Sequence, residues 1–122
     1  MKKNTQGQAL LTFLIFVLIS LTITSAASVV SLINSQSSQK IEQGTITAQA
    51  AESGVENALL RLLRDPSYSG ETLSIGTSTV VVTISGSTIT SVATNGNFKR
   101  QIQVITSYTN NVLTITSWKE LF

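Results

Sequence analysis

The sequence predicts an α+β fold in which one long N-terminal helix packs on a small antiparallel β-sheet. An uncharged apolar run over Ala9–Ile33, followed by helically spaced apolar residues as far as Leu63, predicts the helix. From Tyr68 onward, Thr, Ser, Val and Ile dominate and recur between turn residues, which predicts the sheet. One apolar sheet face covered by one apolar helix stripe forms a single α+β head domain.

The chain opens with a basic tip and the apolar run follows. After Lys2 and Lys3 the next charged residue is Lys40, and a helix over Ala9–Ile33 is about 38 Å long at ~1.5 Å per residue. The hydrocarbon core of a bilayer is about 30 Å thick, so the segment is long enough to span it with some tilt, and too long for an ordinary buried helix. Basic residues stay inside, which predicts a cytoplasmic N-terminus and an external head.

A cleaved secretory signal is an alternative interpretation of the same segment. Lys2 and Lys3 provide its basic region, and Ser25-Ala26-Ala27 offers small residues for cleavage before Ser28. Against this interpretation, the apolar stretch continues beyond that point as far as Ile33.

An amphipathic helical pattern extends the apolar segment over residues 34–66. We expect one helix over Gln8–Leu63, ended by Asp65-Pro66 because the residue before a proline disfavours helix. The face expected to cover the sheet contains Ile41, Ala48, Val55, Leu59 and Leu62. Small residues around Gly54 indicate an Ala-rich packing face, and Glu52 and Glu56 are interpreted as solvated charges.

Residues 67–122 are expected to form the antiparallel sheet, which joins residues 41–63 in the head domain. Alternation of side-chain type with a period of two predicts four or five short strands. They are expected near Leu73–Ile75, Val80–Ser85, Ile89–Thr94, Lys99–Ser107 and Val112–Trp118, with Asn95-Gly96 as the clearest hairpin signal.

Composition argues against catalysis and against nucleic-acid binding. The chain has no cysteine and no histidine, and its carboxylates are dispersed, so we expect no enzyme activity, no cofactor and no metal site. The net charge is only +2, which makes nucleic acid an unlikely partner. Lys99-Arg100 is a short basic patch, interpreted as a solvated strand edge, with DNA contact as the weaker hypothesis.

The segment Lys2–Ile15 resembles a class III leader of type IV pilins, and in particular of minor pilins of the PilX type. The segment Ala48–Leu59 is similar to an Ala-rich stretch frequent in PilX-like chains. The resemblance implies that residues 1–7 are a leader, that prepilin peptidase cuts after Gly7, and that the new N-terminal residue Gln8 is methylated. Unlike a signal peptidase, this enzyme leaves the apolar helix attached.

The resemblance also implies partners and a location. Residues 8–33 span the cytoplasmic membrane in a single pass, contacting lipid, and later pack against other pilin or pseudopilin subunits in an extracellular filament built by the pilus assembly machinery. The residues implied in filament-core packing are Ala9, Leu10, Leu11, Thr12, Phe13, Leu14, Phe16 and Val17.

Two departures from the family pattern bear on the role of the subunit. Major pilins carry a glutamate where this chain has Thr12, and its carboxylate neutralises the amine of a neighbouring subunit in an apolar bundle. A subunit without that acid fits a minor or tip position, or a merely anchored protein. The chain also lacks the cysteines of the C-terminal disulfide loop found in many pilins.

Two function classes remain open at this point. The leading one is a structural subunit, minor or located at the tip, of a type IV pilus-like filament serving surface, secretion or DNA-uptake functions. The other is a stand-alone bitopic membrane protein that displays a small β-rich binding or adhesion head. The first residue of the mature chain discriminates between them, because a pilin begins at Gln8.

Overall fold

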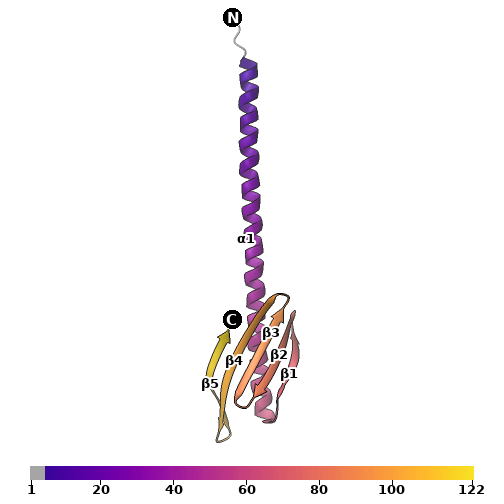
Figure 1. Cartoon of the computed structure of the whole chain (residues 1–122), viewed down its shortest axis with the longest axis vertical. Coiled ribbons are helices and arrows are strands. Elements are labelled where there is room, and N and C mark those ends of the chain that lie inside the picture. Colours follow the sequence, from indigo (N-terminus) through magenta and orange to yellow (C-terminus); the bar gives the residue numbers. More distant parts are fainter. Residues whose placement is uncertain (1–4) are drawn as a thin grey trace. The chain divides into compact units, whose positions relative to one another are not determined.

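The computed structural model describes residues 5–122 and confirms the α+β class (Figure 1). Helix α1 (Thr5–Arg64) is followed by a five-stranded antiparallel sheet. The chain divides into two compact units, Met1–Gln39 and Lys40–Phe122, so the boundary falls inside α1. Of the expected leader, Met1–Asn4 with both lysines lies outside the described residues. The second unit, which we call the head, contains the last turns of α1 and the whole sheet.

The strands follow one another in a simple meander, and every expected strand is present (Figure 1). The sheet order is β1-β2-β3-β4-β5, with all neighbours antiparallel. Their bounds are β1 (Gly70–Ile75), β2 (Ser78–Ser85), β3 (Thr88–Asn95), β4 (Phe98–Thr109) and β5 (Val112–Leu121).

Two-residue loops connect the strands and fix their register. Gly76, Gly86 and Gly96 each open a loop with φ near +60° (59°, 59° and 57°), as expected for a type II′ turn with glycine first. In the last loop Asn110 and Asn111 both have positive φ, as a type I′ turn requires. The predicted hairpin at Asn95 is confirmed, but Asn95 pairs with Phe98, so the loop itself is Gly96-Asn97.

The head core lies between α1 and strands β2–β4. Large β-branched side chains come from the sheet, and small residues come from the helix. The fully or almost fully buried sheet residues are Ser78, Val80, Val82, Ile89, Ser91, Ala93, Ile102 and Val104. The buried helix residues are Gly44, Thr47, Ala50, Ala51, Gly54, Val55 and Ala58. Small helix residues allow the helix axis to approach the sheet closely, so β-branched strand side chains fill the interface.

The helix face that packs on the sheet differs from the predicted one. Val55 is fully buried, and Leu59 and Leu62 pack against the core, but Ala48 is only half-buried. Ile41 is 71% exposed, so its assignment to the core was wrong. Successive helical residues are turned by about 100°, and the buried line through positions 44, 47, 51, 54 and 58 therefore leaves Ile41 on the helix flank.

A polar cluster ties the end of α1 to β1. One carboxylate oxygen of Glu71 accepts hydrogen bonds from the Asn57 amide at 2.8 Å and the Tyr68 hydroxyl at 2.9 Å, and pairs with Arg61 Nε at 2.9 Å. The Arg61 guanidinium also lies over the Tyr68 ring, 5.7 Å from its centroid. The hydrogen bond from Tyr68, with those of Asn57 and the charge of Arg61, lowers the pKa of Glu71. Burial, together with Glu71, raises the pKa of Tyr68 to about 12.

Candidate assembly surface

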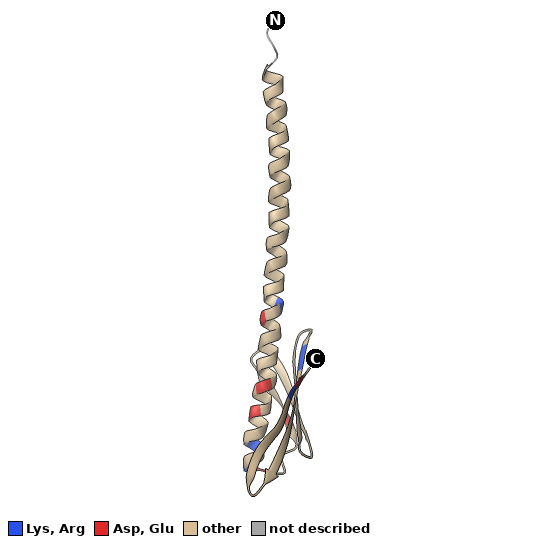
Figure 2. Ribbon diagram, turned by 90° about the vertical axis from the view of Figure 1, so that its left-hand side faces the viewer, with Lys and Arg blue, Asp and Glu red and all other residues tan. Residues whose placement is uncertain are grey.

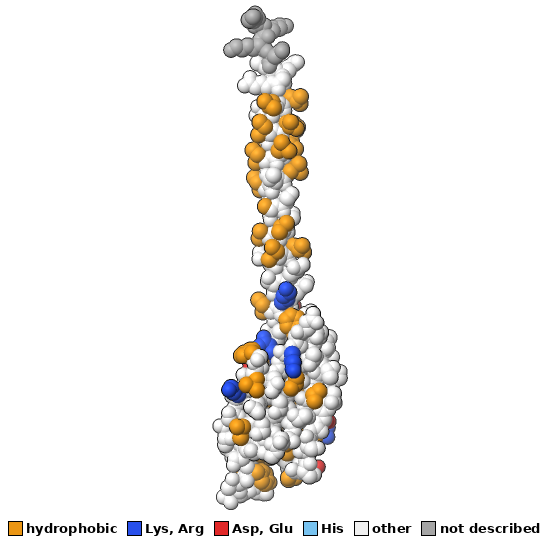
Figure 3. Space-filling view, in the orientation of Figure 1, with side chains coloured by type: hydrophobic (Ala, Val, Ile, Leu, Met, Phe, Trp, Pro, Cys, Tyr) orange, Lys and Arg blue, Asp and Glu red, His pale blue; other side chains and the backbone are white. Residues whose placement is uncertain are grey.

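The surface that sets this chain apart is the apolar first part of α1. Its window of highest mean hydropathy reaches 2.4 and none of that window is buried, so α1 contains one segment long and apolar enough to cross a membrane. No charged residue occurs between Thr5 and Gln39 (Figure 2). The space-filling view shows hydrophobic side chains along this unit without charged ones among them (Figure 3). Apolar surface of this kind is stable against lipid or against other apolar helices, and not in water.

Six of the seven hydroxyl groups between Ala9 and Ile33 donate hydrogen bonds within the helix. Thr12, Ser20, Thr24, Ser25 and Ser28 each donate to the carbonyl oxygen four residues earlier, at 2.8 to 2.9 Å, and Thr22 donates to that of Ile19 at 2.8 Å. Such back-bonding removes most of the cost of placing a hydroxyl in hydrocarbon. The polar dilution of the second half of the segment is therefore compatible with a membrane.

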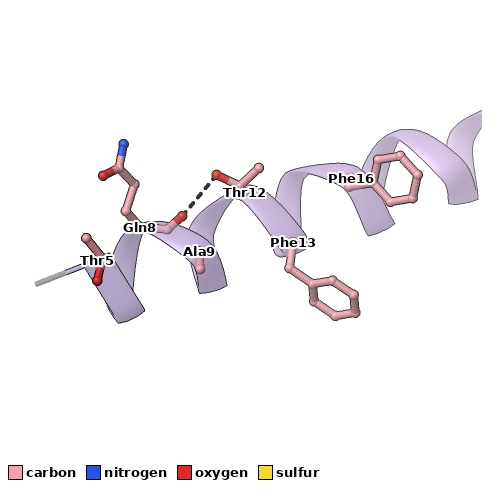
Figure 4. A pocket seen from close by; sticks show the side chains of 6 residues that line it. All are labelled: Thr5, Gln8, Ala9, Thr12, Phe13 and Phe16. Atoms are coloured by element: carbon pink, nitrogen blue, oxygen red, sulfur yellow. Dashed lines mark hydrogen bonds between the residues drawn. The ribbon is translucent and has the colours of Figure 1, made fainter.

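The expected processing site lies in the first turns of α1. Gly7 and Gln8 are exposed and helical, and nothing lies within 4 Å of where a Gly7 Cβ would stand. Figure 4 shows Gln8 beside Thr12, whose hydroxyl donates to the Gln8 carbonyl oxygen at 2.9 Å. A peptidase requires an extended substrate, so cutting after Gly7 requires this first turn to open, and helix ends open most easily.

The residues expected to pack in a filament core surround the helix on all sides. Phe13 and Phe16 project from it (Figure 4) and are 66% and 68% exposed. Leu10 is 71% exposed, and Val17 is only half-exposed. The others, also exposed, are Ala9, Leu11, Thr12 and Leu14. Because consecutive residues are turned by about 100°, this set can contact several neighbouring helices at once.

The expected basic patch at Lys99-Arg100 is divided between two faces of the sheet. Lys99 is exposed on the face away from α1, whereas Arg100 faces the helix, 3.7 Å from a Glu120 carboxylate oxygen and 5.1 Å from the Phe122 ring centroid. The interpretation as a strand edge was wrong, because β4 lies between β3 and β5. Neighbouring residues of a strand point to opposite faces, so adjacent cations in a strand form no joint patch.

The strand register places two residues, Lys99 and Lys119, on the same face of the sheet, which the sequence alone did not indicate. Lys119 of β5 lies opposite Gln103 and so shares the outward face of the sheet with Lys99. A bulge between Ile105 and Thr106 shifts the pairing of β4 with β5 by one residue, so the alternation along the sequence alone would place Lys119 on the opposite face.

Among residues 5–122, no three carboxylate, histidine or cysteine side chains cluster in a way that holds a metal ion. Glu52 and Glu56 are exposed, as expected for solvated charges. The arrangement is suited to contact with lipid and with other polypeptides. No family model, curated protein or solved structure matches this chain.

Proposed function

We propose that this chain is a structural subunit of a type IV pilus-like filament, processed after Gly7 by a prepilin peptidase. Its apolar helix anchors it in the cytoplasmic membrane, N-terminus inside and head outside, until it enters the filament. There the same helix packs against the helices of other subunits. Its apolar surface thus contacts lipid before assembly and protein after it.

One observation carries this proposal. Large side chains on every side of the Ala9–Ile33 helix are exposed, uncharged and apolar, while the head has its own core. A membrane anchor needs only such a helix, but Gly7-Gln8 at its start supplies in addition the processing point of the pilin pattern. A filament core of helices requires contacts on several sides, which this helix offers.

Thr12 favours a minor or tip position within that filament. Threonine is uncharged, and its hydroxyl donates to the carbonyl oxygen of Gln8, so the side chain supplies no negative charge for the ammonium group of a neighbour. An ammonium group in an apolar bundle is costly without a counter-charge. A subunit with Thr12 therefore fits best where no further subunit needs that charge, at the tip or at rare positions.

The exposed apolar helix also supports a second candidate, the stand-alone bitopic protein with a binding head. Back-bonded hydroxyls such as those of Ser20 and Thr24 suit a helix that remains in lipid. This candidate needs no cleavage after Gly7 and no contacts between copies.

In the decisive experiment, membranes containing the full chain are incubated with a prepilin peptidase and the product is analysed by intact mass spectrometry. We expect a product that begins at Gln8, and its mass should rise by one methyl group when a methyl donor is present. Gly7→Val should block cleavage, because a β-branched side chain then occupies the open space beside the scissile bond. Thr5→Val is the matched control and should be cut normally.

An intact Met1 in the presence of active peptidase, or a product that begins at Ser28, would defeat the pilin proposal. The first result favours the stand-alone anchored protein, and the second favours a cleaved secretory signal.

A further inference from the structure

The head carries unpaired charges of opposite sign on its two outward faces. The acidic face lies on α1, on the side turned away from the sheet, and contains Glu42, Gln49, Glu52 and Glu56, all exposed. At about 100° per residue, Glu42, Gln49 and Glu56 lie within roughly 40° of each other and opposite the buried line of Gly44 to Ala58. Figure 2 shows acidic positions along this helix and basic positions on the strands.

The basic face is the side of the sheet turned away from α1. It contains Lys99 and Lys119, both exposed, with Gln101 and Gln103 between them. It contains no carboxylate, because Glu71 and Glu120 lie on the helix side, opposite buried Val82 and Ile102. Around these residues the face is rich in hydroxyls and half-exposed β-branched side chains, including Thr83, Thr94, Val81, Val92 and Ile105.

These charges have no ion-pair partners within the described part of the chain. Over residues 5–122 the ion pairs within 4.0 Å are Arg61–Glu71 and Arg100–Glu120. The first pair joins α1 to β1, and the second joins β4 to β5 on the helix side of the sheet. Neither pair uses a residue of the two outward faces. The acidic face therefore has three unpaired carboxylates, and the basic face two unpaired ammonium groups.

The two faces also match in spacing. Lys119 lies opposite Gln103, so it is four residues along the sheet from Lys99 and one strand across, about 14 Å at ~3.4 Å per residue and ~4.8 Å per strand. Glu42 and Glu52 are ten residues apart on α1, which is a rise of about 15 Å along the helix axis at ~1.5 Å per residue and a turn of about 80° around it. Two lysines of one copy can thus meet two glutamates of another at the same time.

We infer that the acidic α1 face of one head binds the basic sheet face of a second copy of this chain. This inference rests on the proposed assembly of copies and adds a contact between heads to the contact between apolar helices. Two different faces meet, so the contact is heterologous: each copy keeps one free face, and copies add in a row without closing. A contact of this symmetry suits a short run of copies at the tip of a filament, the place that Thr12 favours, and pairing identical faces would oppose like charges.

Exposed ion pairs are individually weak, and salt screens them. The contact therefore depends on the membrane anchors, which hold copies at high local concentration. At that concentration even a weak attraction between two heads leads to substantial binding. The head contact sets the order and orientation of neighbours, while the apolar helices hold them in place.

Cysteine cross-linking in the full chain, reconstituted in lipid vesicles, tests the contact directly because the chain has no cysteine of its own. Gln49→Cys places a thiol on the acidic face and Gln101→Cys places one on the basic face. These positions lie on opposite sides of one head, so a disulfide between them joins two copies. We expect dimers when the two single variants are mixed, a ladder of larger products from the double variant, and little from either single variant alone.

The matched control replaces Gln101→Cys with Thr72→Cys, on the same outward sheet face but on β1, three strands from β4. We expect it to cross-link poorly with Gln49→Cys. High salt should reduce the Gln49–Gln101 product, and reversing one charged face should lower its yield by roughly tenfold.

Charge exchange provides the strongest test. Glu42→Lys with Glu52→Lys and Glu56→Lys should reduce the ladder by the same factor of roughly ten, and so should Lys99→Glu with Lys119→Glu. Mixing these two kinds of chain should restore complementarity in an alternating row, because intact faces meet at one junction and reversed faces of opposite sign meet at the next. Combining all five substitutions in one chain should restore complementarity between identical copies. We expect the ladder to return in the combined variant.

A second cross-linking experiment, in the apolar helix, distinguishes failure of this inference from failure of the proposed function. Single cysteines at Ser25, Ala26, Ala27 and Ser28 report contact between apolar helices over one full turn. Cross-links there, without any between Gln49 and Gln101, overturn the head contact and leave the filament subunit intact. Cross-links at neither location overturn both. Failure of the combined charge variant to restore the ladder also overturns the head contact.

Discussion

Gly54 of α1 lies directly against Ser91 of β3, and this contact sets the distance between helix and sheet. A Cβ added at Gly54 would overlap the Ser91 hydroxyl oxygen and come within 2.6 Å of Val80 Cγ1. Glycine normally weakens a helix by about 1 kcal/mol relative to alanine. The close approach explains why glycine occurs here despite its weaker helix propensity, since any larger residue would push the helix away from the sheet.

Gly54→Ala should therefore destabilise the head, although alanine is the better helix former. Overpacking of a tight core costs about 1–3 kcal/mol, more than the helix gains. Denaturant unfolding of the full chain in detergent micelles, followed by the fluorescence of its single tryptophan, Trp118, measures the change. Gly44→Ala is the matched control, because its Cβ would lie 3.6 Å from Arg100, an ordinary contact, and it should be neutral or stabilising. Equal effects of the two substitutions would contradict this account of the interface.

Ser91→Ala should raise stability, in contrast to most core substitutions. The Ser91 hydroxyl is fully buried and has no hydrogen-bond partner among the described residues. Burying an unbonded hydroxyl costs about 1–3 kcal/mol by mutational measures, and alanine removes the hydroxyl with little change in shape. We expect a gain of about 1 kcal/mol in the same unfolding measurement.

Thr106→Val is the comparison for that substitution. The Thr106 hydroxyl is also buried but donates to the Ser87 carbonyl oxygen at 3.1 Å. Its removal should cost about 1 kcal/mol. A loss of stability in Ser91→Ala similar to that in Thr106→Val would mean that the Ser91 hydroxyl has a partner in solution.

Glu71 should make the head sensitive to acid. Its pKa in the folded chain is below the ordinary value of 4.5, so its contribution to stability is present above pH 4.5 and is lost as pH falls through the lowered value. Glu71→Gln should lower the unfolding midpoint at neutral pH and flatten the fall in stability below pH 4.5. Glu56→Gln, at an exposed position without an ion pair, is the control and should leave the acid limb unchanged.

Tyr68 should make the stability of the head depend on pH in alkaline solution as well. Its pKa is raised from 10.0 to about 12 in the folded chain, so its contribution is complete below pH 10 and is lost as pH rises toward 12. Tyr68→Phe should remove that dependence, which a series of unfolding curves between neutral and alkaline pH will detect. An alkaline limb that persists in Tyr68→Phe would assign it to another group.

Under the proposed function, position 12 should decide how often the chain enters a filament. Thr12→Val loses only a hydrogen bond to the subunit's own backbone, so membrane insertion and incorporation should be unchanged. Thr12→Glu supplies a carboxylate for the amine of a neighbour, and incorporation along the filament should increase. Immunogold counts on sheared filaments measure this, and a fall in incorporation with Thr12→Glu would contradict the role assigned to Thr12.

The strands could be predicted from sequence because local signals agree at each of them. Alternating residues define β2 and β3, and a glycine or an Asn pair at each loop fixes where one strand ends and the next begins. The helix end was equally local, because Asp65-Pro66 ends α1 one residue after the expected position. The start was not predicted: α1 begins at Thr5, three residues before the expected Gln8.

The side of α1 that meets the sheet, and the sheet face that each cation occupies, were less predictable. Counting large apolar residues placed Ile41 in the core, whereas packing selected the small residues Gly44 and Gly54 because the strands supply the bulk. Lys119 could be placed on the same sheet face as Lys99 only with the β4–β5 register, including its bulge. Both are properties of the tertiary arrangement, which no local pattern encodes.

The central claim, that this chain is a filament subunit processed after Gly7, is tested most directly by recovering it from cells. Filaments are sheared from the surface and separated from membranes, and the chain in each fraction is identified by mass spectrometry of its N-terminal peptide. We predict that the sheared fraction contains the chain and that it begins at Gln8. Recovery from the membrane fraction alone, with Met1 intact, would contradict the account.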